Sequence, residues 1–253
     1  QRYKLTIEYD GRDYFGWQRQ DDFPTIQEAL ETAAAKLDGA PVLVQGAGRT
    51  DRGVHATGQV AHMDLTKPRP INKIADAMNF HLRPNHIAVL KAEEVYPDFN
   101  ARFDAKYRRY RYIIINRRAD LALDRGQAWR VPSKLDHGAM HRAAQYLIGE
   151  HDFSTFRDAE CQAKSPVRSL DKIDVARYGE GVEITVGAIS FLHRQVRSIV
   201  GSLVEVGRGV QSEEWIKTIL EACDRKACGP VAPPDGLFLE SVDYDYRGAR
   251  FAK

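Results

Sequence analysis

The residues best suited to chemistry lie in segment 46–55, whose sequence is Gly-Ala-Gly-Arg-Thr-Asp-Arg-Gly-Val-His. Its glycines permit positive φ angles and let the backbone approach a ligand closely. The segment is not a Walker phosphate loop, because no Gly-Lys-Ser/Thr follows, and it does not open a helix as a dinucleotide fingerprint must. A lone Arg-x-Asp in a tight connection is usually a surface salt bridge. Asp51 is therefore a candidate catalytic carboxylate only if other groups support it.

One supporting group is Arg49, two residues before Asp51. An aspartate that acts as a nucleophile or base must stay ionised while partly shielded from water, and shielding alone raises its pKa. A nearby guanidinium opposes that shift. A strand-like stretch would project both side chains to the same side. We therefore predict that Arg49 is the counter-ion of Asp51.

Segment 102–112 interleaves aromatic and basic residues and is predicted to contain a strand. Strand alternation puts Arg108, Tyr110 and Tyr112 on one face and Tyr107, Arg109 and Arg111 on the other. Aromatic faces stack on bases, which contributes about 1–3 kcal/mol per base, while arginines bind phosphates. The alternative is an edge strand with tyrosines in the core and arginines in solvent. Tyr110 is thus either a base-stacking residue or a core residue.

A predicted helix over 191–206 carries an apolar stripe at helical spacing. Arg197 falls at the edge of this stripe, where a cation either extends to water or meets a buried acid. Gly201 costs about 1 kcal/mol relative to alanine in a helix interior, which predicts close packing on that side. His193 is a possible ligand or base, but a packed or solvated histidine is the commoner case.

Hydrophobic periodicity predicts two halves with the same order of elements. Strands at 3–9, 42–45, 59–65 and 87–95 and helices at 26–37 and 71–82 give a β-α-β-β-α-β half, with Thr25 as a helix N-cap. The second half has strands at 107–115, 170–178, 182–189 and 236–244 and helices at 136–147, 191–206 and 212–223.

We therefore predict an α+β fold of two split βαβ halves, ferredoxin-like and RRM-like, over residues 1–105 and 106–253. The first half would carry the catalytic aspartate loop, and the second the stacking tyrosine and the second arginine. The mostly antiparallel sheets are expected to join into one extended sheet, with helices on one side and a central RNA-binding cleft.

Composition narrows the class of protein. The apolar fraction of 43% and the charged fraction of 28% argue against a disordered or fibrous chain. The net charge of +2 is too small to indicate nucleic acid by itself, but arginines and lysines cluster locally. Cys161, Cys223 and Cys228 are expected to be reduced thiols without a metal. No apolar run is long enough to span a membrane, and no export signal is present, so a cytoplasmic location is expected.

Several motifs occur in a characteristic order along nearly the whole chain. They are Tyr9-Asp10-Gly11, Gly16-Trp17-Gln18-Arg19-Gln20, Gly48-Arg49-Thr50-Asp51, Gly53-Val54-His55, Phe99-Asn100-Ala101-Arg102-Phe103, Arg109-Tyr110-Arg111-Tyr112, His193, Val196-Arg197, Ile199-Val200-Gly201-Ser202 and Gly236-Leu237-Phe238-Leu239. In these motifs the chain resembles the tRNA pseudouridine synthase A family.

The resemblance implies that Asp51 is the catalytic aspartate, that Tyr110 stacks on the base, and that Arg49 and Arg197 attend the aspartate. It implies tRNA contacts for two segments and for Arg69 and, more weakly, His86. The residues of the two segments are Phe99, Asn100, Ala101, Arg102 and Phe103, and Glu160, Cys161, Gln162, Ala163 and Lys164.

The family modifies uridines at about positions 38, 39 and 40 of the tRNA anticodon stem-loop, as a homodimer without metal or cofactor. We expect the same here, with Arg52 or another arginine holding the opened base stack. The sequence departs from the family in segment 223–228, which matches no motif. It departs also at Arg52, where other members carry a smaller residue.

Two other functions are considered. A glycoside or nucleoside hydrolase ordinarily needs two carboxylates, whereas only Asp51 has a motif around it. A non-catalytic RNA-binding module would share the element order, but the aromatic signature of an RNA-recognition strand is absent.

Overall fold

The computed structural model describes residues 1–245, in two compact units. The first unit consists of Gln1–Tyr107 and the chain from Phe238 onward, and the second of Arg108–Leu237. Residues 246–253, which end the predicted C-terminal half, lie outside the described residues.

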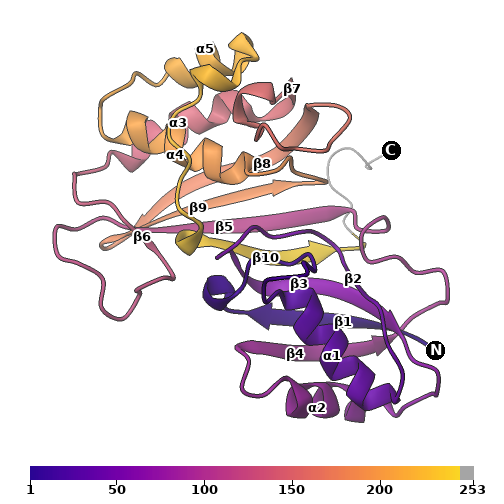
Figure 1. The fold of residues 1–253 in the computed structure, drawn as a ribbon. Coiled ribbons are helices and arrows are strands. Elements are labelled where there is room, and N and C mark those ends of the chain that lie inside the picture. Colours follow the sequence, from indigo (N-terminus) through magenta and orange to yellow (C-terminus); the bar gives the residue numbers. More distant parts are fainter. Residues whose placement is uncertain (246–253) are drawn as a thin grey trace. The chain divides into compact units, whose positions relative to one another are not determined.

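The first unit has the predicted β-α-β-β-α-β order (Figure 1). Its elements are β1 (Arg2–Tyr9), α1 (Ile26–Asp38), β2 (Val44–Gly46), β3 (His55–Asp64), α2 (Ile71–Leu82) and β4 (Ile87–Glu94). β1 pairs antiparallel with both β3 and β4, and β2 pairs antiparallel with β3.

Local sequence accounts for these elements. β1 alternates, burying Tyr3, Leu5, Ile7 and Tyr9 on one face. The Thr25 hydroxyl accepts a hydrogen bond from Glu28 N and so caps α1, as predicted. α1 and α2 contact each other, and α2 also packs on β4 (Figure 1).

The last strand, β10 (Leu237–Asp243), also belongs largely to the first unit. It pairs in parallel with β3, with Phe238 opposite His55 and Leu239 opposite Ala56. We predicted the whole of this strand for the C-terminal half. The contact-based units therefore differ from the predicted halves, because the chain after Phe238 returns to the strand that follows the Asp51 loop.

Apart from Tyr107, the second unit contains β5 (Tyr107–Ile115), and it also contains β6 (Trp129–Arg130), α3 (His137–Ala144), β7 (Gly149–Asp152), β8 (Val167–Tyr178), β9 (Gly181–Ala188), α4 (Gln195–Gly207) and α5 (Trp215–Ala222). Its main strands run in the antiparallel order β5-β9-β8-β7, with β6 parallel to β5. Both units are mixed α+β with mostly antiparallel strands, which confirms the predicted fold class. The predicted central cleft stays a prediction.

Two features of the second unit differ from prediction. β6 and β7 were not predicted, so the element order of the first half does not simply repeat. α4 begins at Gln195 rather than at residue 191, because Arg194 adopts a left-handed conformation with φ 57°. The preceding turn is closed by a hydrogen bond from Leu192 N to the Gln195 side chain at 2.8 Å.

Within residues 1–245, no helix combines the length and the apolar character needed to cross a bilayer.

Candidate active site

Asp51 lies in the connection between β2 and β3, and its side chain is half-buried. Arg49 and Arg52 on either side of it are exposed. Residues 47–54 belong to no regular helix or strand. The counter-ion role of Arg49 stays a prediction.

The segment that follows β1 packs directly against this loop. Trp17 N donates to the Thr50 carbonyl at 3.0 Å, and Gly53 N donates to the Tyr14 carbonyl at 3.4 Å. Gly16 has φ +95°, and a Cβ there would lie 2.7 Å from the Thr50 carbonyl oxygen. Only glycine fits this contact.

Buried polar side chains hold the loop from the sheet. Tyr9 Oη shares a hydrogen bond with Thr50 Oγ1 at 2.8 Å, and Gln59 Nε2 donates to the Gly48 carbonyl at 2.8 Å. Gln59 is fully buried, so these bonds are shielded from water. The backbone that carries Asp51 is thereby fixed on two sides.

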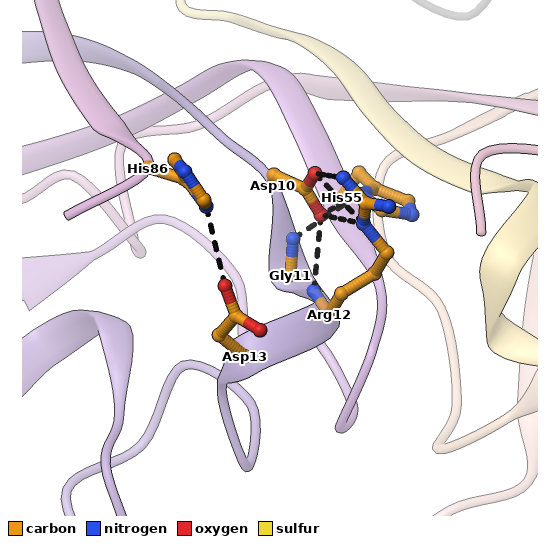
Figure 2. Close-up of polar contacts among 6 residues, drawn as sticks. All are labelled: Asp10, Gly11, Arg12, Asp13, His55 and His86. Atoms are coloured by element: carbon orange, nitrogen blue, oxygen red, sulfur yellow. Dashed lines mark hydrogen bonds and ion pairs between the residues drawn. The ribbon is translucent and has the colours of Figure 1, made fainter. Parts of the chain in front are cut away.

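A charged turn at the end of β1 fixes the far end of the loop (Figure 2). The Asp10 carboxylate accepts hydrogen bonds from the Arg12 backbone at 3.1 Å and from the Arg12 guanidinium. Nδ1 of His55, the first residue of β3, lies 3.2 Å from Asp10 Oδ1 and accepts a hydrogen bond from Gly11 N at 3.1 Å. A Cβ at Gly11 would lie 2.0 Å from the Val54 carbonyl oxygen.

The electrostatics of this turn favour an ionised carboxylate. Burial alone would raise the pKa of Asp10, but the hydrogen bonds from the Arg12 side chain and backbone lower the pKa below its ordinary value. His55 is only 1% exposed and stacks on Phe238, with ring centroids 4.7 Å apart. The turn thus couples the loop to both β1 and β10.

In the second unit, β5 shows the predicted alternation. Arg108, Tyr110 and Tyr112 are buried, whereas Arg109 is exposed and Arg111 half-buried. Tyr107 is buried as well, although we placed it on the opposite face.

Tyr110, the predicted stacking residue, is 8% exposed and meets Phe191 edge to face with ring centroids 5.1 Å apart. Tyr112 donates to the Pro233 carbonyl at 2.8 Å, and burial raises its pKa well above the ordinary value.

Arg197 lies in the first turns of α4 and is held by segment 230–232. Its Nε donates to the Ala232 carbonyl at 2.8 Å, and Ala232 N donates back to the Arg197 carbonyl at 3.1 Å. A Cβ at Gly201 would lie 1.7 Å from the Pro230 carbonyl oxygen. The close packing predicted at Gly201 is therefore confirmed.

The predicted tRNA segment 99–103 has a buried half and an exposed half. Phe99 and Ala101 join Ala47 and Val60 in a core cluster, so their side chains face the protein. The Asn100 side chain accepts hydrogen bonds from the backbones of Arg102 and Phe103. These last two side chains are exposed, with Phe103 at 76%, and they are the ones available to a ligand.

The second predicted tRNA segment, 160–164, is tied down by Arg157, whose guanidinium donates to the Cys161 and Ala163 carbonyls at 2.7 and 2.8 Å. Glu160, Gln162 and Lys164 are exposed. A cavity of about 320 Å³ lies beside this segment. It is lined by Ser154, Arg157, Asp158, Ala159, Cys223, Asp224 and Arg225.

Asp158 anchors the start of this segment. It accepts from Glu160 N at 3.0 Å and from the Arg194 guanidinium at 2.9 Å, with His193 Nδ1 3.7 Å away. Burial alone would raise its pKa, but these neighbours lower the pKa below the ordinary value. His193 thus lies beside a carboxylate, with its own side chain 33% exposed.

The remaining predicted residues lie at the surface. Arg69 is exposed and donates to the Leu37 carbonyl at 3.2 Å, and His86 pairs with Asp13 at 3.2 Å (Figure 2). Cys161, Cys223 and Cys228 are free cysteines. In the part of the chain that the structure describes, no three His, Cys, Asp or Glu side chains gather to hold a metal ion.

Sequence reasoning gave no role to the residues that position the loop. Tyr9, Asp10, Gly11, Gly16 and Gln59 all contact it. The sequence did offer one signal. Gly11 and Gly16 lie close together in a segment rich in aromatic residues, and such glycines can indicate that another part of the backbone approaches closely.

Similarity to known proteins shows the family to which the chain belongs. The model of the family described as tRNA pseudouridine synthase matches residues 5–104 and 143–245. The chain belongs to the tRNA pseudouridine synthase family. It is 66% identical over 243 residues to the tRNA pseudouridine synthase A of Hyphomonas neptunium, covering 96% of this chain and 98% of the relative. It is 64% identical to that of Maricaulis maris, with the same coverage.

Membership of this family confirms the predicted enzyme class, an isomerase of the pseudouridine synthase type acting on tRNA. A solved structure described as a Cbf5-Nop10-Gar1 complex matches 88% of this chain and 68% of its own, with a TM-score of 0.33 and 13% identity. That likeness is too low to support an argument.

Proposed function

We propose that this pseudouridine synthase acts on uridines of the tRNA anticodon stem-loop, at about positions 38, 39 and 40, with Asp51 as its catalytic carboxylate. The observation that carries the proposal is the fixed loop: Asp51 is half-buried, while the backbone on both sides of it is held by hydrogen bonds and glycine contacts. Such preorganisation is what a single catalytic side chain requires.

The reaction breaks the N1–C1′ bond of uridine, turns the base and forms a C5–C1′ bond, while C5 loses a proton and N1 gains one. Neither water nor a redox partner is consumed, so one carboxylate is sufficient. Asp51 can attack C1′, add to C6 of the base, or remove the C2′ proton. Each route needs the aspartate as an anion, a state that a neighbouring guanidinium favours.

The target base must first leave its stack. We assign Tyr110 to the flipped base, Arg49 and Arg197 to the charge of Asp51, and Arg52 to the opened stack. Arg69, Arg102, Phe103 and the exposed residues of 160–164 contact the RNA in this scheme. No metal or cofactor takes part. We also expect a cytoplasmic homodimer, which light scattering of the purified protein would reveal as twice the monomer mass.

The test uses tRNAs labelled with [5-³H]uridine in which anticodon-arm uridines are replaced one at a time. Release of tritium, with pseudouridine in nuclease digests of the product, is expected for substrates that keep the target uridine and is lost when that uridine is replaced. Free uracil would instead identify a hydrolase. Tritium release that survives replacement of all uridines at positions 38–40 would refute the proposed target.

A further inference from the structure

Three side chains form a stack next to the Asp51 loop. The Arg52 guanidinium carbon lies 3.9 Å from the centroid of the Phe15 ring. Phe23 stacks on Phe15 as well, with centroids 4.2 Å apart and an interplanar angle of 19°. We refer to Phe15, Phe23 and Arg52 as the aromatic stack. It combines two nearly parallel rings with a planar cation.

The stack is fixed to the proposed catalytic loop through the backbone. Arg52 follows Asp51 directly, and Phe15 precedes Gly16. A Cβ on Gly16 would lie 2.7 Å from the Thr50 carbonyl oxygen, 3.2 Å from the Asp51 carbonyl carbon and 3.3 Å from Arg52 N. The backbones that carry the stack are therefore in van der Waals contact beside Asp51.

The loop that carries the two rings is closed on itself. Phe15 N donates to the Pro24 carbonyl at 2.9 Å, and Gln20 Nε2 donates to the Phe15 carbonyl at 2.9 Å. These bonds join the base of the loop, so the two rings are held together before any ligand arrives. A prebuilt platform loses little conformational entropy on binding.

Phe23 is the outer ring of the aromatic stack, and burial of apolar surface does not explain its position. Phe23 is 45% exposed, and Arg52 is exposed as well. A structural aromatic contact would ordinarily place its rings in the core, whereas this one presents ring surface to solvent. Planar nucleobases stack on exposed aromatic rings and on guanidinium planes, and each such contact typically contributes about 5- to 100-fold in affinity.

Charge favours a base over a phosphate as the group on the stack. Asp21 and Asp22 precede Phe23 and are exposed, so they would repel a phosphate at the outer ring. Arg49 and Arg52 supply positive charge at the other end, beside Asp51. An RNA strand would accordingly lay its backbone toward the arginines and a base on the rings.

We propose that the aromatic stack binds an unmodified nucleobase of the tRNA adjacent to the uridine that is isomerised. The proposal rests on the proposed function and adds a substrate-binding surface to it. Flipping the target uridine exposes the faces of its neighbours, and a ring at this place replaces the lost stacking partner.

The test measures KM, single-turnover rate and a photocrosslink in the full-length protein. RNA stem-loops carry 5-iodocytidine or 5-iodouridine at one non-target position at a time, since a 5-iodopyrimidine crosslinks on irradiation to an aromatic ring stacked on it. We expect a crosslink to Phe23 or Phe15 from one position next to the target. Phe23→Leu is expected to raise KM about 5- to 100-fold and to change the saturating rate less than about threefold.

Phe23→Trp restores stacking and should recover most of the KM. The matched control is Phe80→Leu, which removes another exposed ring of the first unit, 67% exposed on α2, and should leave KM unchanged. Arg52→Gln, at an exposed position that carries little risk to folding, is expected to raise KM in the same direction as Phe23→Leu.

Wild-type KM in both Phe23→Leu and Arg52→Gln, or the absence of any crosslink to the two rings, would overturn the inference. A loss of folded protein in Phe23→Leu without a crosslink in the wild type would show that the stack is structural, and would overturn it equally. Failure of the proposed function is distinguishable, because then the wild type itself releases no tritium from the same RNAs.

Discussion

Asp10 in the first unit and Asp158 in the second occupy similar turns in different surroundings. Each accepts a hydrogen bond from the backbone two residues later, Arg12 N at 3.1 Å and Glu160 N at 3.0 Å. Each also has an arginine and a histidine beside it, and in each the pKa lies below the ordinary value. The two turns tie different functional segments, the Asp51 loop and the 160–164 segment.

The difference lies in the histidines. His55, beside Asp10, is 1% exposed and stacks on Phe238. The His193 side chain, beside Asp158, is 33% exposed, and that of its neighbour Arg194 is 41% exposed. His55 thus ties its turn to β10 through a buried contact, whereas His193 and Arg194 reach solvent, where water and salt weaken their attraction to Asp158.

The largest effect is expected from Gly11→Ala, which drives a Cβ to 2.0 Å from the Val54 carbonyl oxygen. We expect a loss of about 3–4 kcal/mol in the free energy of unfolding, together with slower tritium release. Urea unfolding measures the first quantity. The control is Gly39→Ala, with φ +83° and no atom within 4 Å of the added Cβ, which should cost only about 1 kcal/mol of backbone strain. Equal losses would remove the distinction between a packed and an open glycine.

The histidines give the next largest contrast. His55→Ala leaves Gly11 N without its acceptor and opens a cavity beside Phe238, so we expect a loss of about 2–3 kcal/mol. His193→Ala removes a partly exposed partner and should cost less than about 1 kcal/mol. Chemical denaturation of both variants at pH 7 measures the difference. Similar losses would contradict the contrast between a buried and a solvated anchor.

The pH dependence of Asp10→Asn isolates the charge of the turn that follows β1. Asparagine keeps an oxygen acceptor for Arg12 N but lacks the negative charge. The variant should therefore lose only about 1–2 kcal/mol in the free energy of unfolding at neutral pH. The pKa of Asp10 is lowered in the folded state, so this stability is fully present above the ordinary aspartate pKa. It is lost as the pH falls through the lowered pKa. Urea midpoints of both proteins should therefore converge in acid, and a constant difference would rule out an electrostatic origin.

The smallest effect is expected from Arg194→Gln, which removes the guanidinium from Asp158. Because the Arg194 side chain is 41% exposed, we expect a change of about 0.5 kcal/mol or less in stability. That difference should shrink further in about 1 M salt, where the screening length is about 3 Å. Thermal unfolding at low and high salt measures it. A salt-independent loss would show that the Asp158–Arg194 pair is shielded from water and salt.

The helices and strands that were predicted correctly are those whose local sequence patterns suit the packing that they adopt in the fold. The residues of β5 and α2 match the predicted ranges, because strand alternation and the end of α2 before Pro84 act locally. A glycine in the interior of a helix, Gly201, also correctly predicted a close contact with another segment. By contrast, β7 has the sequence Gly-Glu-His-Asp, which carries no apolar alternation, and it forms by pairing with β8.

The candidate site was predictable only in part. The Asp51 loop is evident from its glycines and charges, but Asp10 and His55 lie forty-five positions apart and meet only through the pairing of β1 and β3. The aromatic stack likewise depends on the close approach of Gly16 to the Thr50 carbonyl. Such contacts between distant segments leave no periodic signal in one sequence.

The central claim is that Asp51 is the catalytic carboxylate, and single-turnover tritium release from [5-³H]uridine tRNA tests it most directly. We predict that Asp51→Asn lowers the rate at least about 10³-fold, equivalent to about 4 kcal/mol, while tRNA affinity stays within several-fold. Asp76→Asn, the same change at an exposed position of α2, should keep the wild-type rate. Undiminished tritium release by Asp51→Asn would contradict the assignment.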